Sequence, residues 1–197
     1  MPKQAVMISI RPEWCQLIAQ GKKTVEVRKT RPKLETPFKC YIYCTRSQKG
    51  ASDFLETHGT DGKIRPANQK VIGEFVCDEI HDCRDVNMDD TCITVKDWLN
   101  YTKGHEGAVY GWHISDLVIY DKPKRLDEFS VTDNAAVQGC FNRQLAGQPE
   151  YVTKHDGWLK GSYICHKDCE PDWCTKCKTK PLKRPPQSWC YVYGGAE

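Results

Sequence analysis

Residues 6–29, VMISIRPEWCQLIAQGKKTVEVRK, contain the signals for a strand, a helix and a second strand in quick succession. The apolar run from Val6 to Ile10 predicts a short strand. Pro12 suits the first turn of a helix, and the apolar side chains after it recur at helical spacing until Gly21 ends the helix. From Lys23 to Lys29 apolar and polar residues alternate, which predicts a strand with one apolar and one polar face. The stretch favours a mixed α+β fold.

The rest of the chain is rich in predicted strands and poor in helices. Thr94 caps a short predicted helix over 94–101, and residues 46–69 lack a sustained period, so we expect a long loop there. Gly73 predicts a bulge or a close backbone approach, which favours a curved sheet and hence a small β-barrel with short flanking helices. The further predicted strands cover residues 38–44, 71–80, 108–120 (one strand, or two joined at 115–116) and 188–193, the last pairing back into the first sheet.

Composition sets limits on the class of protein. The chain has 197 residues, with 29 basic and 26 acidic side chains and a net charge of +3, so nucleic-acid binding requires local clustering of charge. The first apolar run is too short for a signal sequence and no later run reaches membrane length, so we expect a cytoplasmic protein with reduced thiols. Six of the 12 cysteines lie in or beside apolar runs and are expected to act as small buried hydrophobic residues: Cys15, Cys40, Cys44, Cys77, Cys92 and Cys190.

Residues 163–180, YICHKDCEPDWCTKCKTK, have the spacing of a zinc site. The alternative is a cluster of spare thiols or two disulfides. Four protein donors would close the coordination shell, so we expect Zn²⁺ to be structural rather than catalytic. The expected ligands are Cys165, Cys169, Cys174 and Cys177, with His166 as the alternative to Cys165.

This Cys-rich stretch divides the chain into three parts. We expect a β-barrel core over residues 1–130, a zinc-binding insertion over 131–182, and a strand within 183–197 that returns to the barrel. The zinc-stabilised segment is therefore an insertion and not a tail.

Basic residues gather on the strand after Gly21 and in the loop that follows it. A phosphate backbone would bind such a surface, whereas the plainer alternative is a solvated basic edge that prevents sheet aggregation. Trp112 and His113 point to opposite faces of their predicted strand, so one of them can stack on a base while the other packs. The basic residues are Lys22, Lys23, Arg28, Lys29, Arg31 and Lys33.

Catalytic signals are sparse. Glu26 and Arg28 share one strand face and could simply pair with each other. An enzyme would need proton transfer by groups such as Lys23, Glu26 and Glu74, which the sequence does not place together. His81 near Cys77, Cys83 and Cys92 is disfavoured as a second metal site, because a strand spreads these side chains along its length.

The stretches ISIRPEWCQLIAQGKKTVEVRKTRP, VIGEFVCDEI, YGWHISDL and PPQSWCYV resemble the ASCH domain family of the PUA-like superfamily, in the form common in phage and prophage proteins. The resemblance covers residues 4–130 and 183–193, and a G-x-K-x-x-E-x-R motif is matched at Gly21, Lys23, Glu26 and Arg28. It implies a small curved β-barrel with flanking helices, whose cleft binds RNA or a nucleotide.

The resemblance also implies an enzymatic alternative, because some bacterial relatives are amidohydrolases that use a lysine, a threonine and a glutamate. Lys23 matches the lysine, Glu26 occupies the threonine position, and Glu74 is a candidate for the glutamate. Our leading hypothesis is therefore an RNA-binding or nucleotide-binding protein. The alternatives are a hydrolase acting on a modified nucleoside and a protein-interaction module of phage origin. In the leading hypothesis the ligand contacts come from Lys23, Glu26, Arg28, Lys29 and Arg31, with Trp112 or His113 stacking.

Overall fold

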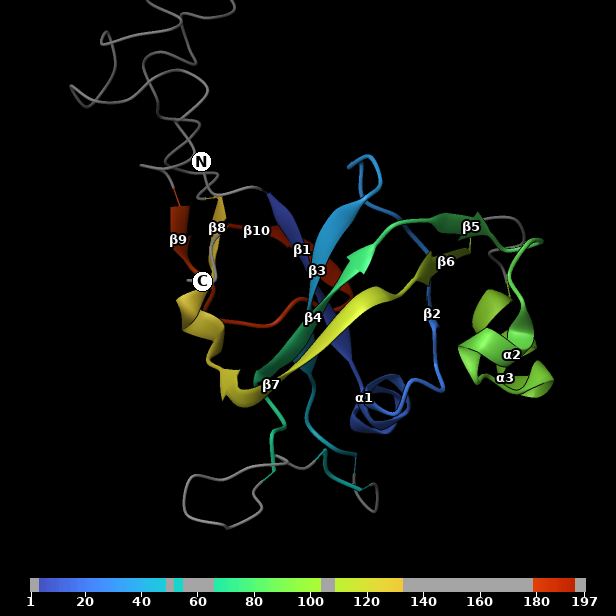
Figure 1. Ribbon diagram of the computed structural model, residues 1–197, viewed down its shortest axis with the longest axis horizontal. Helices are drawn as coiled ribbons and strands as arrows, with labels where there is room; N and C mark the ends of the chain where they lie inside the picture. The colour runs from blue at the N-terminus through green and yellow to red at the C-terminus, as the bar shows by residue number, and fades with distance from the viewer. Residues whose placement is uncertain (1–3, 49–51, 55–65, 104–108, 133–178, 194–197) are drawn as a thin grey trace, which may run out of the picture.

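The computed structural model describes residues 4–48, 52–54, 66–103, 109–132 and 179–193 (Figure 1). In chain order the elements are β1 (Ala5–Ile10), α1 (Pro12–Ala19), β2 (Val25–Arg28), β3 (Phe38–Cys44), β4 (Val71–Cys77), β5 (Ile80–Asp82), α2 (Met88–Thr91), α3 (Val95–Thr102), β6 (Tyr110–His113), β7 (Ser115–Lys124), the 3-10 helix η1 (Leu126–Glu128), β8 (Ser130–Thr132), β9 (Thr179–Pro181) and β10 (Trp189–Val192). The mixed α+β class is confirmed.

The strands form three sheets with the orders β10-β1-β3-β4-β7, β2-β6-β5 and β8-β9. β1 and β3 run parallel, and the other paired strands are antiparallel. Within the described residues, Ser130 and Tyr193 form an isolated bridge between β8 and the end of β10, and the small curved β-barrel expected from the sequence stays a prediction. Figure 1 shows α2 and α3 beside β2 at one end of the molecule, and β8 and β9 at the opposite end.

All six residues of β1 are buried because both faces of the five-stranded sheet are covered. Val6 and Ile8 belong to one core cluster, together with Ile42 from β3. Met7 points the other way, into a second cluster with Phe129. A strand that is buried on both faces reads as a continuous apolar run, which explains the sequence VMISI.

Two glycines have the roles that the sequence predicted. Gly21 lies just past α1 with φ +68°, a conformation that glycine adopts without strain. Gly73 lies on β4 so close to β7 that a Cβ there would be 2.3 Å from the carbonyl oxygen of Val118. The β4–β7 register is irregular between Val71 and Gly73, so the predicted close approach is confirmed.

Most predicted elements are present, with two differences, at 71–80 and at two of the cysteines. The predicted strand 71–80 ends at Cys77 in β4, and Ile80 begins a separate strand, β5. The stretch 108–120 forms two strands, β6 and β7, which is the second of the two predicted arrangements. Cys92 and Cys190 are only partly buried, whereas Cys15, Cys40, Cys44 and Cys77 are buried as expected. The expected pairing of the C-terminal strand is confirmed, because β10 pairs with β1.

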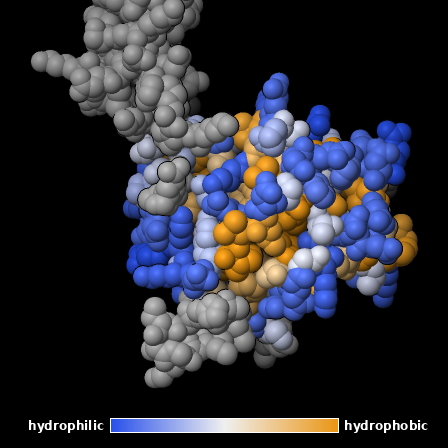
Figure 2. Space-filling model, in the orientation of Figure 1, coloured by the Kyte–Doolittle hydropathy of each residue, from blue (hydrophilic) through white to orange (hydrophobic). Residues whose placement is uncertain are grey.

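β7 lies at the edge of the five-stranded sheet. Figure 2 shows the face of the molecule that carries β4 and β7, with apolar side chains gathered over these two strands and hydrophilic side chains around them. Val118 on β7 is an apolar side chain that is 50% exposed. The same strand also carries charged residues and a proline, among them Asp116, Lys122 and Pro123. Charged residues and proline on an edge strand discourage pairing with another chain.

Candidate functional site

The polar face of β2 and the turn before it hold a compact group of charged side chains, Lys23, Glu26 and Arg28. The turn at Gly21 closes α1, and the backbone N–H of Lys23 donates to the carbonyl of Leu17 at 3.2 Å. Lys23 therefore enters the interior just before β2, with 2% of its surface exposed. Glu26 is 4% exposed, so an acid and a base lie buried in contact with each other.

The ammonium group of Lys23 has protein partners for all its hydrogens. Nζ donates to the carbonyl oxygens of Val25 at 2.8 Å and Thr91 at 2.7 Å, and it lies 3.4 Å from Oε2 of Glu26. It also lies 5.3 Å from the ring centroid of Trp14. Because an ammonium group has three N–H bonds and no acceptor, Lys23 is well placed to hold Glu26 and the α2 backbone.

Glu26 also pairs with Arg28, which lies nearer the surface. Oε1 of Glu26 is 3.0 Å from Nη2 of Arg28, whose side chain is 14% exposed. The same Nη2 donates to the carbonyl of Ser9 at 2.6 Å, so β1 and Glu26 together fix the guanidinium. One carboxylate thus faces two cations, and the group carries a net positive charge.

Two buried donors near this group have no hydrogen-bond partner among the described residues, Nε of Arg28 and Nε1 of Trp112. Glu26 and Trp112 are directly opposite each other on β2 and β6, so their side chains leave the sheet on the same face. Burial of an unpaired donor is costly, and such groups are exceptions in folded proteins.

Aromatic residues that the sequence analysis missed surround the basic strand. Nζ of Lys29 lies 5.0 Å from the ring centroid of Tyr101 on α3, and Arg31 lies 5.4 Å from that of Tyr110 on β6. Burial raises the pKa of the Tyr101 hydroxyl, a shift that the positive charge of Arg28 partly opposes. The helical spacing of α3 could have shown that Tyr101 faces inward, but its contact with Lys29 spans too much sequence to be visible there.

Trp112 and His113 occupy opposite faces of β6, as predicted. Trp112 is fully buried, with its ring centroid 5.9 Å from those of Phe38 and Trp189. His113 is partly exposed, and its Nδ1 lies 2.7 Å from Oδ1 of Asp78. Trp112 is a core residue in this structure, so His113 is the member of the pair that a ligand could reach.

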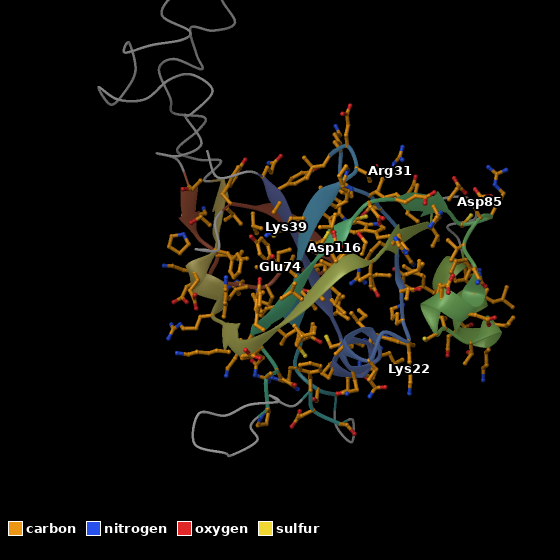
Figure 3. The ribbon with its side chains drawn as sticks, in the orientation of Figure 1. Lys22, Arg31, Lys39, Glu74, Asp85 and Asp116 are labelled. Carbon is orange, nitrogen blue, oxygen red and sulfur yellow. The ribbon has the colours of Figure 1, made fainter. Side chains whose placement is uncertain are left out.

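The structure does not bring Glu74 together with Lys23 and Glu26. Glu74 lies on the opposite face of β4 from the core residue Phe75, and it binds Nζ of Lys39 at 2.7 Å and the hydroxyl of Tyr120. Figure 3 shows Glu74 beside Lys39, well separated from Lys22 near α1. The three groups of the hydrolase alternative are therefore not assembled in one place.

The expected zinc ligands Cys165, His166, Cys169, Cys174 and Cys177 lie outside the described residues. In the part of the chain that the structure does describe, no group of three or more histidine, cysteine, aspartate or glutamate side chains could hold a metal ion. That same part contains no helix long and apolar enough to cross a membrane.

The described strands and short helices form a small mixed α+β domain, in which a group of lysine, glutamate and arginine side chains follows a glycine that ends a helix. The ASCH domain profile matches residues 8–114, which include all of this group. The chain therefore belongs to the ASCH domain family.

Solved structures of ASCH from Zymomonas mobilis are similar to this chain. The unsubstituted protein is 22% identical, with a TM-score of 0.46, and the match covers 62% of this chain and 74% of that chain. A tyrosine-to-phenylalanine mutant of it is 21% identical, with a TM-score of 0.47, and the match covers 64% and 78%. No curated protein matches this chain.

Proposed function

We propose that this ASCH domain binds RNA or a nucleotide at the basic surface of β2. The observation that carries the proposal is the fixed guanidinium of Arg28, which is held by Glu26 and the carbonyl of Ser9. Arginine donates to phosphate and to base edges through a planar fork, and a guanidinium held in place loses little entropy on binding.

Lys29 and Arg31 extend this surface, and each lies over a tyrosine ring. Basic groups interleaved with aromatic rings are typical of sites that bind single-stranded nucleic acid, because phosphates contact the cations and bases stack on the rings. His113 lies on the other face of the three-stranded sheet from Glu26, so the proposed RNA surface does not need it.

A hydrolase acting on a modified nucleoside is the second candidate, and the buried contact between Lys23 and Glu26 favours it. Proton transfer would require Lys23 to give up a proton. Its ammonium group also donates to two carbonyl oxygens, and these hydrogen bonds favour the protonated form. We therefore assign Lys23 a positioning role. Turnover of an acylated nucleoside that is lost in Lys23→Ala, with the fold intact, would reverse this assignment.

We also propose a structural Zn²⁺ held by Cys165 or His166 with Cys169, Cys174 and Cys177, a proposal that rests on spacing alone. Metal analysis of the purified full chain tests it. Cys174→Ser should lower the zinc content, whereas Cys190→Ser in β10 should not. Equal zinc content in all three proteins would contradict the assignment.

The proposed RNA site is tested by titrating the full chain with single-stranded RNA, duplex RNA and DNA at two salt concentrations. Arg28→Ala should weaken binding by about 1 to 3 kcal/mol if the guanidinium contacts a base. If it contacts only phosphate, the salt dependence should fall by about 0.7 in log–log slope on single strands, whatever the sequence.

Arg84→Ala is the matched control, since Arg84 is exposed and lies in an acidic region beside Asp82. Arg28→Lys keeps the charge but removes the fork, and the unfolding midpoint of each variant shows whether the fold survives. Equal weakening by Arg84→Ala, or no binding to any nucleic acid or nucleotide, would contradict the proposal.

A further inference from the structure

Two imidazole rings lie side by side on the face of the three-stranded sheet opposite to the one that carries Glu26 and Trp112. His81 on β5 is opposite Gly111 on β6, and His113 is two residues further along β6, so both side chains leave the sheet on the same face. Their ring centroids are 6.4 Å apart, with an interplanar angle of 75°. Gly111 itself has no side chain, and the side chains of Val86 and Val25 pack over it.

Each ring has a carboxylate at the same nitrogen. Nδ1 of His113 is 2.7 Å from Asp78, and Nδ1 of His81 is 3.4 Å from Glu79. A carboxylate in this position favours the tautomer with its proton on Nδ1, which leaves the lone pair on Nε2. Histidines that bind metals are typically oriented in this way by a carboxylate.

The surroundings of the two rings attract cations. Asp78 and Glu79 are exposed, and Asp82 follows His81 directly. Figure 3 shows Asp85 at this end of the molecule, apart from Glu74 and Lys39. The side chains of His81 and His113 are 24% and 38% exposed, so solvent ions can reach them.

We propose that His81 and His113 bind a divalent transition-metal ion, Zn²⁺, Ni²⁺ or Cu²⁺, through their Nε2 atoms. Imidazole suits these three ions. Rings that share one tetrahedral metal have centroids about 5 Å apart, given metal–nitrogen distances of about 2 Å. The two rings must therefore approach by about 1 Å for both Nε2 atoms to reach one metal ion.

Two protein ligands leave the remaining coordination positions to water or to an external ligand. The site therefore differs from the closed, thiolate-rich site proposed in the Cys-rich segment, and it should exchange its metal more readily. Asp78 and Glu79 are positioning residues that orient the rings rather than ligands.

The test uses the full chain after zinc loading and removal of weakly bound zinc by gel filtration, so that thiolate ligands are occupied while the histidine site is free when Ni²⁺ is added. Calorimetric titration should show Ni²⁺ binding that His81→Gln or His113→Gln weakens at least tenfold and that the double variant abolishes. Asp78→Asn should weaken binding about 10-fold to 100-fold, the usual effect of removing a carboxylate partner of a ligand histidine. Nitrogen-15 spectra of the imidazoles add a residue-specific readout, because paramagnetic Ni²⁺ should broaden the signals of His81 and His113 before those of the other histidines.

Unchanged unfolding midpoints in the presence of a chelator would show that the variants keep their fold. Ni²⁺ affinity in the double variant equal to that of the unsubstituted protein would overturn the proposal. Broadening that begins at the other histidines would do so as well.

Discussion

Replacing Glu26 by glutamine tests the central feature of the β2 site, the carboxylate between two cations. The substitution keeps the shape of the side chain and removes its charge. Lys23, at 3.4 Å, and Arg28, at 3.0 Å, would then face each other's positive charge without compensation. Lys23 is fully enclosed, so it cannot move its charge into water.

Removing one partner of a buried ion pair costs about 3 to 5 kcal/mol, because the other charge stays buried and unpaired. At about 2 to 4 °C per kcal/mol for a chain of this length, the melting temperature should fall by about 6 to 20 °C. The ion pair between Lys39 and Glu74 is the matched comparison, since 46% of the Lys39 side chain is exposed. Glu74→Gln should cost about 1 kcal/mol or less.

Urea unfolding of Glu26→Gln, Lys23→Met and the double variant completes the experiment. Removing both charges leaves Arg28 bound to the carbonyl of Ser9, so the double variant should be more stable than the sum of the single losses predicts, by about 1 to 3 kcal/mol. Losses that add within about 0.5 kcal/mol would refute the coupling. A cost for Glu26→Gln no larger than that for Glu74→Gln would refute the claim that burial decides the magnitude.

Three other predictions concern single positions. Gly73→Ala places a Cβ against the Val118 carbonyl at 2.3 Å and should lower the free energy of unfolding by about 1 to 3 kcal/mol in urea; an unchanged midpoint would contradict the close approach. Thr94→Ala removes the side-chain acceptor for the Asp97 N–H at the start of α3 and should cost about 1 kcal/mol, seen as faster amide exchange in α3 alone. Burial alone would raise the pKa of Glu74, but hydrogen bonds from Lys39 and Tyr120 outweigh it, so the pKa lies below its ordinary value of 4.5. Ionised Glu74 therefore contributes fully to the free energy of unfolding above that value, and the contribution is lost as the pH falls through the lower pKa of the folded state. Urea titrations between about pH 6 and pH 3 should show this loss in the unsubstituted protein and not in Glu74→Gln.

The first three elements of the chain, β1, α1 and β2, could be predicted because their signals are local. The apolar run of β1, Pro12 at the start of α1 and Gly21 at its end all act within a few residues of themselves. The alternation in β2 correctly placed Glu26 and Arg28 on one face, and the pairing between them is confirmed. Local periodicity is enough for such features because a strand repeats every two residues.

The depth of the site could not be predicted in the same way. A lysine before a strand usually lies in solvent, and only Thr91, far along the chain, shows why Lys23 is buried instead. The tyrosines beside Lys29 and Arg31 belong to α3 and β6, and their proximity depends on the pairing of β2 with β6 and on the position of α3, which are set by residues far apart in the sequence. The sequence predicted a small curved β-barrel, and how the three sheets of described strands are arranged depends on contacts between distant segments. The zinc-site prediction concerns residues outside the described part of the chain and stays a prediction.

The pairing of β8 with β9 has a consequence for how this domain can vary. Thr132 and Thr179 are partners in the antiparallel register, so the chain leaves the core and returns to it at neighbouring positions. Loop-closure entropy grows only with the logarithm of length, so each doubling of the intervening segment costs about 0.6 kcal/mol. The β8–β9 junction is therefore a position at which segments of different length or chemistry can replace residues 133–178 while the paired strands keep their register.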